Sequence, residues 1–139
     1  MFRVRPQATW IVSPGNRSTR GAMRDLVIKA VDLLHRGVHL LVVDHFPAGP
    51  RDPNGTHGAI WEELDDRPFT LPPDRPLTVA SYVGGAVQEA FVEPAAIGEP
   101  LPDMALFLSP EIYVSVPLEK TYLSAWEDVP EYWRGVLEA

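Results

Sequence analysis

The fold is decided between Thr9 and Phe46, where the chain reads TWIVSPGNRSTRGAMRDLVIKAVDLLHRGVHLLVVDHF. Ala8–Val12 is short, apolar and rich in residues that favour β-strands. The residues Ser13-Pro-Gly-Asn16 then predict a turn, because proline cannot continue a strand ladder and glycine and asparagine accept turn dihedral angles. The sequence therefore predicts a strand that ends in a tight turn.

An amphipathic helix is predicted from Arg20 to Arg36. Ser18 or Thr19 caps its first turn, and Gly37 stands where a glycine commonly ends a helix. Apolar residues recur at three- and four-residue spacing and form one stripe, which consists of Met23, Leu26, Val27, Ala30, Leu33 and Leu34. A ladder of alternating charges within one turn of each other occupies another face, and it consists of Asp25, Lys29, Asp32 and Arg36.

The run Val38–Val43 is almost wholly apolar, as expected of a strand buried on both faces of a sheet. A strand, a helix and a second strand in this order predict a right-handed crossover between parallel strands. Downstream, Leu77–Val83 and Glu89–Ile97 flank Gly84-Gly85, which indicates a β-hairpin. Shorter elements are predicted as a helix at Thr56–Leu64, extended segments at Met104–Leu108 and Tyr113–Val116, and helices from Pro117 onward. The prediction is one α/β domain, 1–139, with a small mixed, partly parallel sheet.

Composition narrows the classes of function. The chain has 139 residues and a formal net charge of −7, which argues against non-specific binding to phosphate backbones. It has no cysteine, so disulfides and thiolate metal sites are excluded. No apolar run reaches membrane-spanning length, and the N-terminus has no signal-peptide core. We therefore predict a cytoplasmic protein without a membrane partner; a role for nucleic acid stays open.

Several blocks of sequence carry a family resemblance. They are Ile11–Ser18 (IVSPGNRS), Gly37–Asp44 (GVHLLVVD), Pro47–Pro53 (PAGPRDP), His57–Glu63 (HGAIWEE), Val92–Pro94, Pro100–Met104 and Pro117–Tyr122. The chain resembles a bacterial family of unknown function whose longer members carry these blocks in the same order. The resemblance covers almost the whole chain and implies that it corresponds to their C-terminal portion, truncated at the N-terminus.

More distantly, the pattern of strand, Ser-Pro turn, helix, Gly-Val pair and strand is similar to Uma-type proteins of the restriction-endonuclease-like (PD-(D/E)xK) superfamily. That resemblance implies two carboxylates that hold Mg²⁺, a metal-activated water for phosphodiester hydrolysis, and a lysine that supports the reaction. Lys29, eight residues before Gly37, matches the lysine of the relatives. Trp10 stands where they have an acidic residue. The resemblance places the first aspartate of the signature on an upstream strand, which we expect this chain to lack.

Two residues are candidates for catalysis. Lys29 is either the matching catalytic lysine or an ordinary rung of the charge ladder between Asp25 and Asp32. Asp44 ends the buried strand, and ligand sites of parallel sheets gather at the carboxyl ends of strands, although aspartate also ends strands as a turn residue.

Other residues are candidates for binding. The turn before the long helix offers backbone N–H groups and polar side chains to an anion, and its candidate residues are Ser13, Asn16, Arg17 and Ser18. A metal site built from His39, His45, His57 and Asp44 is weighed against ordinary core or loop histidines, and no metal ligand is assigned. C-terminal aromatic residues favour packing or self-association: Tyr113, Tyr122, Trp126, Tyr132 and Trp133.

Three functions follow, in this order. The first is a non-catalytic, nuclease-like domain that acts as a binding or interaction module, without a cofactor. The second is an active Mg²⁺-dependent nuclease whose carboxylates are relocated, for example to Asp44 and Asp25. The third is a structural protein that forms homo-oligomers. Whether the chain is an enzyme is left open by the sequence.

Overall fold

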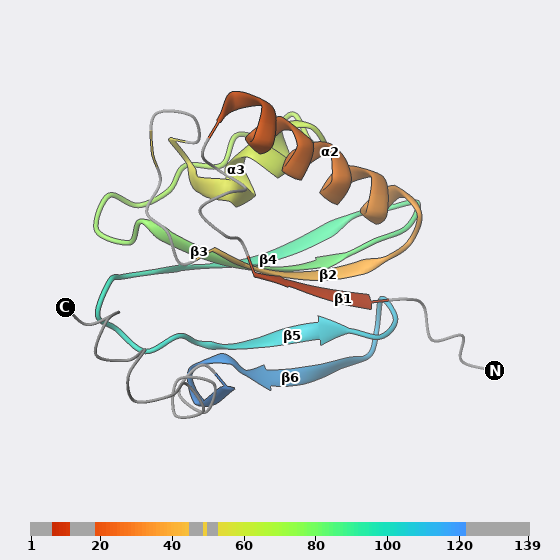
Figure 1. Cartoon of the computed structure of the whole chain (residues 1–139). Coiled ribbons are helices and arrows are strands. Elements are labelled where there is room, and N and C mark those ends of the chain that lie inside the picture. Colours follow the sequence, from red (N-terminus) through yellow and green to blue (C-terminus); the bar gives the residue numbers. More distant parts are fainter. Residues whose placement is uncertain (1–6, 12–18, 45–48, 50–52, 122–139) are drawn as a thin grey trace, which may run out of the picture.

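The computed structural model describes residues 7–11, 19–44, 49 and 53–121, which form a mixed α/β fold (Figure 1). In chain order the elements are β1 (Gln7–Ile11), α2 (Arg20–His35), β2 (His39–Asp44), α3 (Gly55–Glu62), β3 (Leu77–Val83), β4 (Glu89–Ala95), β5 (Asp103–Phe107) and β6 (Tyr113–Pro117). A short helical turn follows at 118–121. The predicted α/β class is confirmed, while its restriction-endonuclease-like character stays a prediction.

Both ends of α2 are fixed by local hydrogen bonds. The side chain of Thr19 accepts a hydrogen bond of 2.9 Å from the backbone N–H of Ala22, so Thr19 is the cap. At the other end, Gly37 has a φ of 84°. The N–H of Gly37 donates to Leu34 and that of Val38 donates to Leu33, which is the Schellman arrangement. The predicted helix is therefore confirmed, with its last residue one position earlier.

The main sheet has four strands in the order β1-β2-β3-β4. β1 and β2 are parallel, and Trp10 lies opposite Val42. The pairs β2–β3 and β3–β4 are antiparallel, so the predicted hairpin and the predicted parallel pair are both confirmed. Pro94 lies in β4, which is an edge strand of this sheet and tolerates a residue without an N–H.

The sheet is covered on both faces (Figure 1). On one face, α2 and α3 enclose a core that includes Leu34, Ile60 and Tyr82. On the other face, the β5–β6 pair covers a smaller core that includes Leu41, Val79 and Met104. Alternation along the strands sends successive side chains to opposite faces, which explains why Val79 and Tyr82 belong to different cores.

The second sheet is the main addition to the predicted architecture. β5 and β6 pair antiparallel, with Met104 opposite Val116, whereas the sequence indicated only two separate extended segments. Pro117, expected to begin a helix, ends β6 opposite Asp103, and helical structure starts at residue 118. The predicted helices beyond residue 121 lie outside the described residues. Within the described ranges, none of the helices has the length and apolar character needed to cross a membrane.

Candidate functional site

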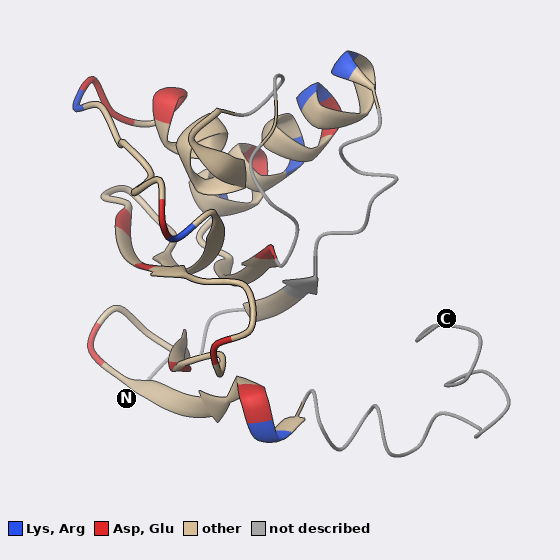
Figure 2. Ribbon diagram, turned by 90° about the vertical axis from the view of Figure 1, so that its left-hand side faces the viewer, with Lys and Arg blue, Asp and Glu red and all other residues tan. Residues whose placement is uncertain are grey.

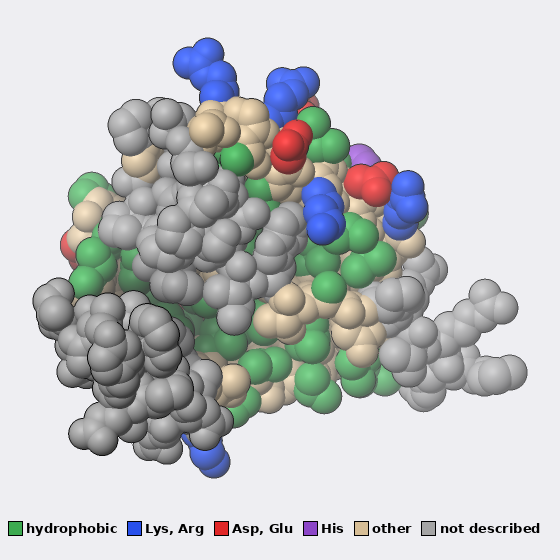
Figure 3. All heavy atoms as spheres, in the orientation of Figure 1, with side chains coloured by type: hydrophobic (Ala, Val, Ile, Leu, Met, Phe, Trp, Pro, Cys, Tyr) green, Lys and Arg blue, Asp and Glu red, His purple; other side chains and the backbone are tan. Residues whose placement is uncertain are grey.

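Lys29 lies on an exposed flank of α2. At 100° per residue, Lys29 is turned 100° away from Ile28 and 160° away from Val31, the two residues that line the surface toward α3. Because α3 packs over β3, the flank that carries Lys29 is the one toward β1. Figure 3 shows this side of the molecule, where charged side chains gather over α2 above a band of hydrophobic ones.

Trp10 of β1 lies opposite Val42 of β2. In the sequence, Trp10 occupies the position at which the resemblance expects a carboxylate, and Lys29 occupies the position of the relatives' lysine.

Asp44, the second candidate for catalysis, is 1% exposed at the end of β2. It accepts a hydrogen bond of 2.5 Å from the hydroxyl of Thr56, which is itself wholly buried in the first turn of α3. Gly55 has a φ of 74°, and a Cβ there would lie 3.2 Å from the hydroxyl of Thr78, the register partner of Asp44. Asp44 therefore ties α3 to the sheet and presents little surface to a ligand.

The histidines considered for a metal site are not brought together. His39 lies at the start of β2, and its Nδ1 accepts a hydrogen bond of 3.0 Å from the N–H of Gly84. Asp44 lies at the other end of β2, five positions after His39, and this odd separation sends the two side chains to opposite faces. His45 lies outside the described residues. No group of three metal-ligating side chains is found within the described ranges.

His57 belongs to the core between α3 and the sheet. Its Nδ1 lies 2.6 Å from the hydroxyl of Tyr82, and its ring stacks on Trp61 and meets Phe69 edge-on. Burial lowers the pKa of His57 to about 4 and raises the pKa of Tyr82. At neutral pH the imidazole is neutral, so the pair is a structural hydrogen bond whose donor is set by the imidazole tautomer.

The four residues of the predicted anion-binding turn, Ser13, Asn16, Arg17 and Ser18, lie outside the described residues. The cap of α2 that follows this turn is Thr19, one of the two predicted caps. Of the aromatic residues expected to pack or associate, Tyr113 is described and is 59% exposed.

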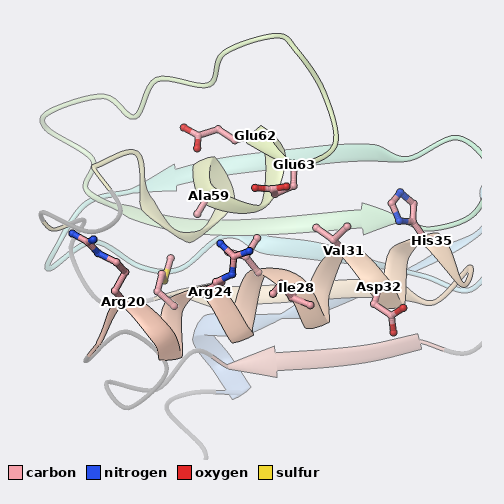
Figure 4. Close-up of a pocket in the computed structure, with 11 residues that line it drawn as sticks. Arg20, Arg24, Ile28, Val31, Asp32, His35, Ala59, Glu62 and Glu63 are labelled. Carbon is pink, nitrogen blue, oxygen red and sulfur yellow. The ribbon is translucent and has the colours of Figure 1, made fainter.

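A groove lies between α2 and α3 on the helical side, with a volume of about 460 Å³ (Figure 4). Its floor is apolar and includes Met23, Val27 and Ala59. Ile28 borders it and is 53% exposed, although it lies outside the apolar stripe that faces the sheet. We name this surface the α2–α3 groove. The sign of this groove in the sequence is Ile28, a large apolar residue outside the predicted apolar stripe of the helix.

Charges of both signs border the α2–α3 groove. Arg20 and Arg24 rise from α2 toward the side on which Glu62 and Glu63 of α3 lie (Figure 4). No ion pair joins these arginines to these glutamates in the part of the chain that the structure describes, whereas Asp32 and Arg36 do pair at 3.0 Å. The groove therefore combines an apolar floor with charges that are available to a binding partner.

Comparisons with protein-family models, with curated proteins and with solved structures found no match to this chain.

Proposed function

We propose that the chain is a non-catalytic interaction module on a restriction-endonuclease-like α/β fold, and that it binds a second copy of itself through the α2–α3 groove. The observation that carries this proposal is the groove itself, in which exposed Ile28 stands on α2 one turn beyond Arg24, with glutamates of α3 on the facing border. An exposed β-branched residue in an apolar groove gains free energy when a partner covers it.

A second copy fits because the surface is complementary to itself. A two-fold interface brings the same patch of both copies together, so each patch has to supply both halves of every contact. Rotation by 180° about an axis through the groove places the glutamates of one copy over the arginines of the other. Each Ile28 then packs against the α3 border of its partner's groove, where the contact is shielded from water.

Two observations support the non-catalytic part of the proposal. Asp44 is buried and hydrogen-bonded to Thr56, so it is poorly placed to hold a metal ion that also contacts a substrate. Trp10 stands at the sequence position where the resemblance expects an acidic residue, and an indole offers no oxygen ligand to Mg²⁺.

Sedimentation velocity at about 1 to 200 µM, a range that resolves dissociation constants of typical weak dimers, tests self-association. We expect a dimer for the unaltered chain and a monomer for Ile28→Glu, because the substitution removes an apolar contact and places a carboxylate against the glutamate border of the partner's groove. Ile97→Glu is the matched control, since Ile97 is also exposed, at 69%, and lies outside the groove; it should leave the dimer intact.

A charge exchange identifies the surface more closely. Arg24→Glu and Glu63→Arg should each weaken the dimer, and the double variant should recover it, because the opposite charges are restored across the axis. A chain that stays monomeric over the whole range, or dimers that Ile28→Glu and Ile97→Glu affect equally, would overturn self-association through this groove.

A Mg²⁺-dependent nuclease is the second candidate, and the match of Lys29 to the lysine of the Uma-type relatives favours it. Calorimetric titration of Mg²⁺ and Mn²⁺, followed by incubation with labelled single- and double-stranded DNA, tests it. Saturable binding and cleavage that Lys29→Ala abolishes would support the nuclease and overturn the non-catalytic proposal. Lys120→Ala, which removes another exposed lysine, is the control.

A further inference from the structure

A second concave surface lies on the other side of the sheet, between β4 and the β5–β6 pair. It has a volume of about 610 Å³ and is lined by residues of β3, β4, β5, β6 and the turn between the last two strands. We name it the hairpin cleft. It is separated from the α2–α3 groove by the four-stranded sheet, so a ligand of one surface does not contact the other.

Ser81 supplies the least expected feature of the hairpin cleft. Its side chain is wholly buried, and its hydroxyl has no hydrogen-bond partner in the described part of the chain. Ser81 lines the cleft, and strand alternation turns it toward the hairpin, because its neighbours Ala80 and Tyr82 pack on the helical side. A buried polar group without a partner is unfavourable, so a ligand donor that reached this hydroxyl would be stabilised.

Aromatic rings form one wall of the hairpin cleft. Phe91 stacks on Phe107 with centroids 5.4 Å apart, and Phe107 meets Tyr113 edge-on at 5.6 Å. Phe107 is buried, whereas Phe91 and Tyr113 are 51% and 59% exposed. The three strands β4, β5 and β6 thus present a continuous aromatic strip with two open rings, whose faces attract cations.

Carboxylates form the rest of the charged lining. Glu93, Asp103 and Glu111 line the cleft, all three are exposed, and no ion pair neutralises them within the described residues. The whole segment 77–119 contains neither lysine nor arginine. Figure 2 shows the consequence: Asp and Glu mark the ribbon on the hairpin side, and the first cation there is Lys120 in the helical turn after β6.

We propose that the hairpin cleft binds an organic cation, which is a protonated alkylamine or a guanidinium group on an apolar stem. The stem packs against Phe91 and Tyr113, the cationic head faces Glu93, and one N–H of the head donates to the Ser81 hydroxyl, while Asp103 and Glu111 at the two ends of β5 add to the negative potential. Aromatic faces with carboxylates recognise this class of ligand, because the ring quadrupole and the carboxylates both attract positive charge.

Isothermal titration at low ionic strength tests the proposal with four small probes. The probes 1,6-diaminohexane and argininamide carry the two candidate head groups, 1,6-hexanediol is the uncharged match of the diamine, and MgCl₂ supplies a bare cation. We expect saturable binding of at least one amine or guanidinium probe, with a dissociation constant on the order of 0.1 mM. Binding of neither, or equal binding of the diol or of Mg²⁺, would overturn an organic-cation site.

Substitutions then locate the site. Glu93→Gln and Tyr113→Leu should each weaken binding about fivefold, as expected for one charge or one cation–π contact, and Ser81→Ala about threefold. Glu89→Gln is the matched control, because Glu89 is also exposed on β4 but does not line the cleft. It should change affinity by less than about twofold. Equal losses for Glu93→Gln and Glu89→Gln would indicate a diffuse acidic surface and overturn the proposal.

Discussion

The concave surfaces on the two sides of the sheet differ in the signs of the charges that line them. The α2–α3 groove is bordered by arginines and glutamates around an exposed isoleucine. The charged residues of the hairpin cleft are all carboxylates, and they stand beside open aromatic rings and a buried hydroxyl. A surface with both signs of charge can pair with its own copy, whereas a surface with one sign needs a partner of the other sign.

This difference arises from the sequence that builds each side. α2 alternates acidic and basic residues on its solvent face, which also stabilises an isolated helix. The segment 77–119 contributes β3 to β6 and contains no basic residue at all. Local helix chemistry therefore gives the helical side its mixed charge, whereas the strands β3 to β6 are not stabilised by opposite charges spaced one helical turn apart.

The largest effect is expected from breaking the core on the helical side. Leu34 is wholly buried in the larger core cluster, whereas Met104 belongs to the smaller one on the hairpin side. Leu34→Ala should lower the free energy of unfolding by about 4 kcal/mol and Met104→Ala by about 2 kcal/mol. Urea unfolding followed by circular dichroism measures both. An equal or larger loss for Met104→Ala would mean that the hairpin side contributes as much stability as the helical side.

Lowering the pH should reduce the stability of the folded protein, because His57 on the helical side becomes protonated. Burial lowers its pKa from 6.5 to about 4, so the unfolded chain binds the proton more tightly than the folded chain. The stability that the neutral imidazole contributes is fully present above about pH 6.5 and is lost progressively down to about pH 4, by up to about 3 kcal/mol.

Urea midpoints measured between pH 4 and 7 check this dependence on pH. His57→Phe should remove most of the slope in that window, although it also lowers the stability at pH 7 because Tyr82 loses its hydrogen-bond partner. A slope that His57→Phe leaves unchanged would assign the effect of acid to other groups.

A smaller loss of stability is expected when the polar contact between α3 and β2 is broken. Thr56→Val keeps the shape of the side chain but removes the donor to the buried carboxylate of Asp44, so the free energy of unfolding should fall by about 2 kcal/mol. Thr78→Val is the matched control, because Thr78 is also buried, lies opposite Asp44 and makes no side-chain hydrogen bond within the described residues. Equal losses for both variants in urea unfolding would contradict the structural role of Asp44.

The strand–helix–strand unit could be predicted from sequence because its signals are local. The cap at Thr19, the apolar stripe of α2 and the glycine at position 37 all act within one helical turn. The pairing of β5 with β6 could not be predicted, since nothing within either short segment specifies a partner or the face of the main sheet that it covers.

The candidate site was harder to predict for the same reason. Asp44 was selected because it ends a buried strand, but its hydrogen bond to Thr56 joins residues on either side of a proline-rich loop that has no periodic pattern. The hairpin cleft depends on contacts between β3, β4 and β6. In the sequence, Ser81 is one polar residue in an apolar strand and gives no sign of its missing partner.

The smallest expected effect has the opposite sign and sharpens the contrast between the two sides. Ser81→Ala should raise the free energy of unfolding of the free protein by about 0.5 to 1 kcal/mol, because it removes a buried hydroxyl that has no partner within the described residues. The same variant should bind the amine probe less tightly, so stability and binding change in opposite directions. If Ser81 had a purely structural role, its substitution would lower the free energy of unfolding of the protein. Urea unfolding with and without 1,6-diaminohexane separates these outcomes, since the probe should stabilise the unaltered chain more than the variant.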